Sequence, residues 1–174
     1  KQLHALRVAS VMLSGDNQTT ANVLGATVGI DDARGNLLPE DKLAAIADLI
    51  NQYGKVGMVG DGINDAPVLA RASIGFAMGS AGTDTAIDTA DVALMDDDLR
   101  KLPQFIVLSR DTFRILRQNI TLAITIKVVF FALALAGNAT LWMAVFADMG
   151  ISLIVILNGL RLLRPKGGVH LKPN

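Results

Sequence analysis

Short apolar runs alternate with helix-forming stretches along the first 98 residues of the chain. The apolar runs predict strands at 6–13, 55–59, 73–78 and 91–95. Stretches of helical character separate them, at 18–28, from 39 onward, at 64–71 and at 83–89, whereas 29–38 is a turn-rich connection. Strands that alternate with helices predict an α/β fold with a mostly parallel, doubly wound sheet.

The helix that opens at Pro39 has its own start signals. Proline suits the first helical turn, and Glu40 and Asp41 place negative charge where the helix dipole favours it. Its apolar stripe is predicted to be Leu43, Ile46, Ala47 and Ile50.

The pattern changes after residue 98. Residues 99–119 read as a basic helix, with Arg110, Arg114 and Arg117 on one face. Two apolar runs follow, at about 120–136 and 141–157, each near the ~20 residues that a membrane span requires. Arginines precede the first run and basic residues follow the second, so the positive-inside rule predicts a helical hairpin with both outer ends in the cytoplasm. A solvated stalk explains the arginine face more simply than a site for anionic lipid does.

Charge divides the chain at the same point. Residues 1–98 hold 6 Lys and Arg against 14 Asp and Glu, whereas 99–174 hold 10 against 2. An acidic first part argues against nucleic acid as its partner, because phosphate backbones recruit Lys and Arg. The chain has no cysteine, which excludes disulfides, thiolate metal sites and cysteine nucleophiles.

Two polar loops are predicted at strand ends. Ser14-Gly15-Asp16-Asn17 follows the first strand, and Gly60-Asp61-Gly62-Ile63-Asn64-Asp65-Ala66-Pro67 follows the second. Parallel sheets bind ligands at the carboxyl ends of their strands, so both loops belong to one edge. Asp61, Asn64 and Asp65 offer hard oxygen donors, which suit Mg²⁺. The alternative is an Asx-rich turn that caps a helix.

A third acidic group, Asp96-Asp97-Asp98, precedes the basic helix. Consecutive acidic side chains usually point in different directions, so they rarely converge on one ion. We therefore interpret the group as a solvated turn that caps the next helix, in preference to a metal site.

The two apolar runs contain two charged residues, Lys127 and Asp148. Lys127 lies 11 residues before Asn138 and Asp148 lies 10 after it, so an antiparallel hairpin places them at one height, roughly 15 Å from the turn. A charge near the middle of a bilayer costs at least ~2.5 kcal/mol, which favours a functional site. Asp148 would ligate a cation, and Lys127 would neutralise the empty site. The alternative is an ion pair that only fixes helix packing.

These motifs resemble the carboxyl-terminal part of a heavy-metal-transporting P-type ATPase of the zinc, cadmium and lead class. The stretch from Gly60 to Pro67 matches the family's hinge motif, and Ser14-Gly15-Asp16-Asn17 is similar to its Thr-Gly-Asp-Asn motif. Lys42 falls where the family has a phosphate-neutralising lysine. Lys127 and Asp148 resemble the charged pair of the zinc transporters. Copper transporters instead carry tyrosine and asparagine in the first of these two helices and methionine and serine in the second.

The resemblance implies a fold, a site and a location. Residues 1–98 would form the carboxyl-terminal half of a haloacid dehalogenase-like phosphorylation domain, 99–118 a basic stalk helix, 119–163 two transmembrane helices and 164–174 a cytoplasmic tail. The implied Mg²⁺ ligands are Asp61 and Asp65. The implied phosphoryl-transfer residues are Ser14, Gly15, Asp16, Lys42 and Asn64. The parent protein would be a multi-pass pump in a bacterial inner membrane that uses ATP and exports Zn²⁺, Cd²⁺ or Pb²⁺.

One departure limits what this chain does alone. The family's phosphorylated aspartate lies in an Asp-Lys-Thr-Gly-Thr motif, which these 174 residues do not contain. The family's nucleotide-binding and actuator domains and its Cys-Pro-Cys helix are missing as well. We therefore expect the chain to be inactive without the rest of the pump. The rival hypotheses are a membrane-anchored phosphatase and a non-catalytic membrane fragment.

Overall fold

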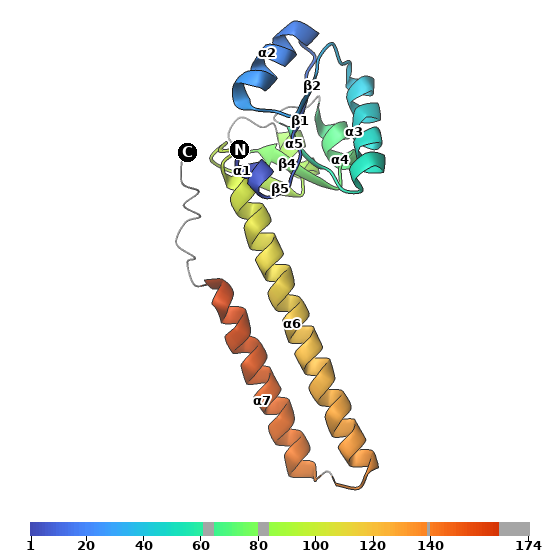
Figure 1. Ribbon diagram of the computed structural model, residues 1–174, viewed down its shortest axis with the longest axis vertical. Coiled ribbons are helices and arrows are strands. Elements are labelled where there is room, and N and C mark those ends of the chain that lie inside the picture. The colour runs from blue at the N-terminus through green and yellow to red at the C-terminus, as the bar shows by residue number, and fades with distance from the viewer. Residues whose placement is uncertain (61–64, 80–83, 139, 164–174) are drawn as a thin grey trace. The chain divides into compact units, whose positions relative to one another are not determined.

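The computed structural model describes residues 1–60, 65–79, 84–138 and 140–163. The chain divides into two units, of which the first is Lys1–Pro103 and the second begins at Gln104. The elements of the first unit, coloured blue to green in Figure 1, are α1 (Gln2–Ala5), β1 (Val11–Leu13), α2 (Gln18–Val28), β2 (Asp32–Arg34), α3 (Pro39–Tyr53), β3 (Gly57–Gly60), α4 (Ala66–Arg71), β4 (Ile74–Met78), α5 (Asp84–Thr89) and β5 (Val92–Leu94).

Every strand pairing in this unit is parallel. β1 pairs with β2, with Val11 opposite Asp32, and β3, β4 and β5 form a second sheet in that order. Helices connect the paired strands, so the predicted α/β fold with a parallel sheet is confirmed. Among the described strands, β1 has one hydrogen-bonded neighbour, β2, and β3 has one, β4.

Two local predictions were wrong. β2 lies inside the stretch that we interpreted as a turn-rich connection, because its sequence, Asp32-Ala33-Arg34, lacks the β-branched and aromatic residues that mark strands. The strand forms through its pairing with β1. The predicted strand at 6–13 is shorter, since β1 begins at Val11 and Leu6 and Arg7 form a turn in which Arg7 has a φ of 58°.

The core of the first unit lies between the β3–β4–β5 sheet and its helices. Leu69 of α4 and Ala77 of β4 are buried against each other, and Met58 packs onto them. On α3 the buried residues are Ala45, Ile46 and Leu49. The predicted stripe was therefore correct at Ile46, whereas Leu43, Ala47 and Ile50 are only partly buried, because the most buried face of α3 lies toward Ala45 and Leu49.

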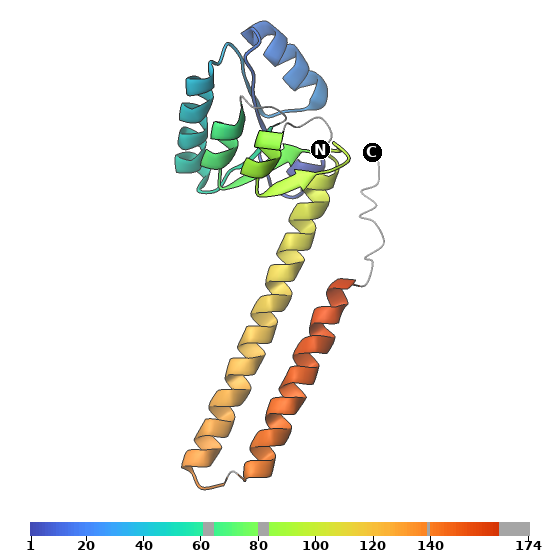
Figure 2. The same cartoon turned by 180° about the vertical axis from the view of Figure 1, so that it is seen from behind.

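The second unit is a helical hairpin. α6 (Lys101–Leu135) and α7 (Leu141–Leu160) lie side by side and antiparallel, in yellow to red, in both Figure 1 and Figure 2, and a short 3₁₀ turn, η2 (Arg161–Leu163), follows α7. The basic stretch and the first apolar run are one continuous helix of 35 residues. By length and composition, both helices could cross a membrane. Most of their large apolar side chains are exposed, including Phe131 and Trp142.

Candidate functional site

A tight polar loop follows the end of β1. The backbone N–H of Ser14 donates to the carbonyl of Arg34 at 2.9 Å, so the pairing with β2 continues into the loop. The Ser14 hydroxyl donates to Oδ2 of Asp16 at 3.0 Å, and the N–H of Asp16 donates back to this hydroxyl at 3.1 Å. These bonds hold a half-buried hydroxyl at the carboxyl end of the strand, where parallel sheets place their ligands.

Gln18 holds this loop in place through two hydrogen bonds. Its Oε1 accepts from the N–H of Gly35 at 2.7 Å, and its Nε2 donates to the carbonyl of Ala33 at 2.7 Å. A Cβ on Gly35 would lie 2.6 Å from Cα of Gln18 and 2.8 Å from the carbonyl oxygen of Asp16. The close approach of these backbones therefore requires glycine at position 35.

The end of β3 is tied to α3 by an ion pair. Nζ of Lys42, in the first turn of α3, lies 3.0 Å from Oδ1 of Asp65, the residue that precedes α4. The two side chains are 19% and 15% exposed, so water screens this pair less than it screens a surface pair. A Cβ on Gly60 would lie 2.9 Å from Cβ of Asp65, which shows how closely the last residue of β3 approaches this carboxylate.

Backbone contacts connect the two loops through the start of α3. The N–H of Leu37 donates to the carbonyl of Ser14 at 3.0 Å, and the N–H of Lys42 donates to the carbonyl of Leu38 at 3.1 Å. The first turn of α3 thus meets the loop after β1 through Leu37 and reaches Asp65 through the Lys42 ammonium. The structure therefore links the loop of Ser14 to the start of α3 through the backbone, and the Lys42 ammonium on α3 to the Asp65 carboxylate through an ion pair.

This group can serve an anion and a cation together. The hydroxyl of Ser14 and the ammonium of Lys42 are donors for phosphoryl oxygens, and donors placed in advance stabilise charge that develops during transfer. The carboxylate of Asp65 is a hard oxygen donor of the kind that Mg²⁺ prefers. These are the parts that phosphoryl transfer needs.

The acidic turn before α6 has contacts of its own. Oδ1 of Asp98 accepts from the backbone N–H of Arg100 at 2.9 Å and from its Nε at 2.8 Å, and Asp96 pairs with Lys101. The Arg100 side chain first, and then its backbone N–H, lowers the pKa of Asp98, while Asp98 raises the pKa of Arg100. These bonds support the interpretation of the turn as a cap. Among the described residues, no group of three His, Cys, Asp or Glu could hold a metal.

In the hairpin, Lys127 and Asp148 are both exposed, and neither forms an ion pair with another residue of the described part of the chain. The helix contacts set their relative height. Asn119 of α6 contacts Val155 and Asn158 of α7. Lys127 lies 8 residues after Asn119, and Asp148 lies 7 residues before Val155 and 10 before Asn158, which supports the equal height predicted from the sequence.

Comparisons with known proteins match nearly the whole chain. A sequence profile for haloacid dehalogenase-like hydrolases matches residues 1–73. A probable cadmium-transporting ATPase of Listeria monocytogenes is 56% identical over 95% of this chain and 24% of its own length. A zinc/cadmium/lead-transporting P-type ATPase of Escherichia coli is 49% identical over 94% of this chain and 22% of its own length. The crystal structure of a zinc-transporting PIB-type ATPase in an E2.Pi state superposes with a TM-score of 0.87 and 48% identity, over 94% of this chain and 26% of that structure.

These matches point to one family. Over nearly its whole length, the chain is similar to one part of the heavy-metal P-type ATPases. It spans about a quarter of the length of the relatives that it matches. The haloacid dehalogenase-like fold inferred from the resemblance is thereby confirmed.

The structure places part of the site that the P-type ATPase resemblance implied. Ser14, Gly15 and Asp16 form the loop after β1, and Lys42 and Asp65 are in contact. Asp61 and Asn64 lie outside the described residues. The resemblance assigned Lys42 to phosphate and Asp65 to Mg²⁺, and the ion pair between them was not predicted. Gln18 was not predicted either, and the neighbouring Gly35 was the only available signal for it.

Proposed function

We propose that this chain is a segment of an ATP-driven exporter of Zn²⁺, Cd²⁺ or Pb²⁺ and contributes part of its phosphorylation site and two of its membrane helices. The observation that carries the proposal is the half-buried pair of Lys42 and Asp65, joined through the start of α3 to the loop of Ser14. The names of the relatives support both the ATPase activity and the class of ion.

The residues of the site fit Mg²⁺. Asp65 presents a carboxylate close to the end of β3, and the motif from Asp61 to Asp65 adds carboxylate and amide oxygens. Asp61, Asp65 and Asn64 would hold the ion, which would neutralise negative charge on the phosphoryl group when bound. ATP would be the phosphoryl donor, held by a domain that these residues do not include.

The chain's own residues have separate tasks in this proposal. The Ser14 hydroxyl turns from Oδ2 of Asp16 to donate to a phosphoryl oxygen, together with the backbone amide of Gly15. Lys42 supplies a positive charge, and Asp65 holds its ammonium in position through the 3.0 Å contact. The phosphorylated aspartate comes from another part of the parent protein, because the 174 residues contain no Asp-Lys-Thr-Gly-Thr motif.

The hairpin contributes the membrane part of the proposal. Its helices cross the bilayer of a bacterial inner membrane, with both outer ends in the cytoplasm, as part of a multi-pass protein. Asp148 ligates the transported cation, and Lys127 balances its charge when the site is empty. Their equal height on α6 and α7 supports this assignment.

Asp65→Asn in the complete pump tests the cytoplasmic site. The change keeps the size of the side chain but removes its charge, so we expect loss of metal-dependent phosphoenzyme formation and a raised Mg²⁺ requirement. Asp48→Asn, at an exposed position on α3, is the matched control and should behave as the wild type. Normal phosphoenzyme in the Asp65→Asn pump would refute the assignment. Hydrolysis of p-nitrophenyl phosphate by the purified 174-residue chain would instead support the rival membrane-anchored phosphatase.

A further inference from the structure

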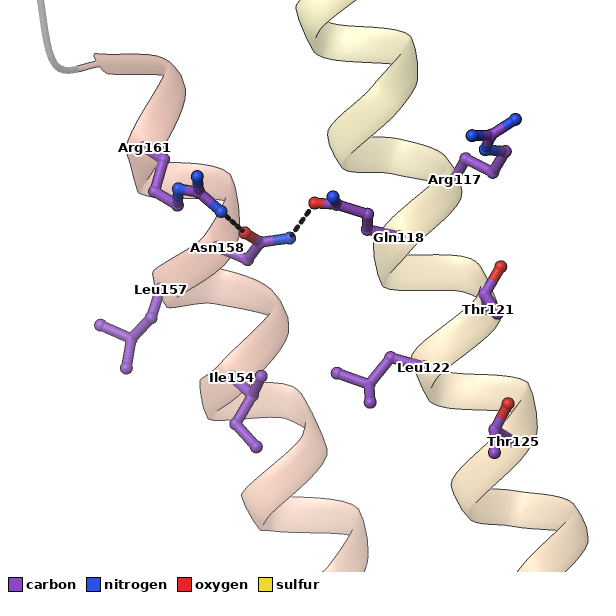
Figure 3. Close-up of a pocket in the computed structure, with 9 residues that line it drawn as sticks. All are labelled: Arg117, Gln118, Thr121, Leu122, Thr125, Ile154, Leu157, Asn158 and Arg161. Carbon is purple, nitrogen blue, oxygen red and sulfur yellow. Dashed lines mark hydrogen bonds between the residues drawn. The ribbon is translucent and has the colours of Figure 1, made fainter.

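A chain of hydrogen bonds crosses between α6 and α7 near the ends that carry arginines. Nδ2 of Asn158 donates to Oδ1 of Asn119 at 2.8 Å and reaches Oε1 of Gln118 at 3.4 Å. Nδ2 of Asn119 reaches the carbonyl of Val155 at 3.5 Å. Asn119 therefore contacts two successive positions on one face of α7. Figure 3 shows Asn158 pointing from α7 toward Gln118 of α6.

Arg161 fixes the direction of this chain. Its Nη1 donates to Oδ1 of Asn158 at 3.0 Å, as Figure 3 shows. A guanidinium only donates, so the amide atom that faces Arg161 must be the oxygen, and the amide nitrogen must face α6. Asn119 then accepts with its oxygen and has its own nitrogen free for Val155. The polar atoms satisfy one another in a single arrangement.

We propose that Asn119 and Asn158 form an interhelical amide pair that sets the register of the α6–α7 hairpin. Both residues are half-buried, and the helix surfaces below them are apolar, with Leu122 and Ile154 along the same groove. Apolar side chains can pack in several helix registers at similar free energy. The amide pair, in contrast, makes its hydrogen bonds in only one register. Side-chain amides hold membrane helices together in the same way.

The register has a consequence for the charged pair. A shift of one helical turn would move Lys127 relative to Asp148 by about 5.4 Å along the hairpin. The amide pair thus positions the carboxylate and the ammonium at one level, about 12 Å from Asn119 at 1.5 Å per residue. This step rests on the proposed cation site, whereas the register itself does not.

The register can be measured by disulfide trapping in membranes that contain the 174-residue chain. The chain has no cysteine, so introduced thiols have no competitors within it. Leu122→Cys with Ile154→Cys reports the present register. Leu122→Cys with Ile151→Cys reports a register shifted by about one turn, because Ile151 lies one turn before Ile154. The measured quantity is the ratio of the two disulfide yields.

We expect Asn119→Leu to lower this ratio about threefold or more, since interhelical side-chain hydrogen bonds contribute modestly in bilayers. Asn119→Asp keeps an oxygen acceptor for Nδ2 of Asn158 and should preserve the ratio. Thr121→Val, in the same groove, changes a hydroxyl to a methyl group without touching the pair, and should also preserve it. An unchanged ratio in Asn119→Leu overturns the proposal, and so does an equal loss in Asn119→Asp.

A second measurement separates this inference from the proposed function. In the complete pump, Asn119→Leu should raise the Zn²⁺ concentration for half-maximal ATP hydrolysis about threefold or more, and Asn119→Asp should not. A pump whose hydrolysis does not respond to any metal refutes the proposed function, while the disulfide ratio still decides the register. A responsive pump with unchanged Zn²⁺ dependence in Asn119→Leu overturns the positioning role.

Discussion

The ammonium of Lys42 lies 3.0 Å from the carboxylate of Asp65, across 23 residues of sequence, and both side chains are largely withdrawn from water. The contact joins the first turn of α3 to the residue that precedes α4. Each partner holds the other where a phosphoryl group and a metal ion could meet. The pair is therefore the structural centre of the proposed phosphorylation site.

Replacing Lys42 with methionine should reduce ATP hydrolysis by the complete pump about 10²-fold or more, which is typical for loss of one preorganised donor to a transition-state oxygen. The change keeps the length of the side chain but removes its charge, and leaves Asp65 unpaired. Steady-state hydrolysis at saturating Zn²⁺ and Mg²⁺ measures the effect. Lys55→Met removes a lysine at an exposed position and should retain full activity. Equal losses in the two variants would contradict the role of Lys42.

Gly60→Ala should destabilise the first unit and displace Asp65. The added Cβ would lie 2.9 Å from Cβ of Asp65, an atom next to the backbone that cannot move away freely. Overpacking of this kind typically costs about 1–3 kcal/mol. Gly57→Ala is the control in the same strand, because its Cβ would meet atoms of Ile74 and Phe76 no closer than 3.4 Å. Thermal unfolding of the whole chain in detergent should show a lower midpoint for Gly60→Ala than for Gly57→Ala.

The contacts of Asp31 predict that the stability of the folded chain depends on pH. Oδ2 of Asp31 accepts from the backbone N–H of Ser10 at 2.7 Å and from the Ser10 hydroxyl at 2.9 Å, and it lies 2.9 Å from Nε2 of His4. These partners, the Ser10 N–H foremost, lower the pKa of Asp31 below 3.8. The folded state therefore favours the carboxylate. Its contribution is present above pH 3.8 and is lost as the pH falls through the folded-state value.

We expect the whole chain to have a higher unfolding midpoint than Asp31→Asn above about pH 5, and the difference to shrink below pH 3.8. Thermal scans at pH 3 to 7 in detergent test this. The effect is small because the carboxylate is exposed. His4→Ala should preserve most of the pH dependence, since the Ser10 N–H is the main cause of the shift. A difference that grows in acid would contradict the assignment.

The sequence predicted those elements whose signals are local. The bounds expected for α2 matched the observed Gln18–Val28, because a polar cap and helical periodicity lie within the segment itself. β2 was missed because Asp32-Ala33-Arg34 becomes a strand through its partner, β1. The residue types of β2 do not indicate this pairing.

Contacts between distant residues were harder to foresee. The motifs placed Ser14 and Asp65 at one sheet edge, and the resemblance assigned Lys42 to phosphate, but the ion pair of Lys42 and Asp65 depends on how α3 packs beside α4. The equal height of Lys127 and Asp148 followed from counting residues about the turn. The amide pair of Asn119 and Asn158 did not, because two asparagines 39 residues apart give no periodic signal.

The central claim is that this hairpin carries the cation site of a metal pump. Asp148→Ala in the complete pump tests it most directly, by Zn²⁺-stimulated ATP hydrolysis in proteoliposomes, with Asp111→Ala, on α6, as the control outside the pair. We expect Asp148→Ala to abolish the stimulation, because the carboxylate would ligate the ion that triggers hydrolysis, and Asp111→Ala to retain it. Undiminished stimulation in Asp148→Ala would refute the cation site.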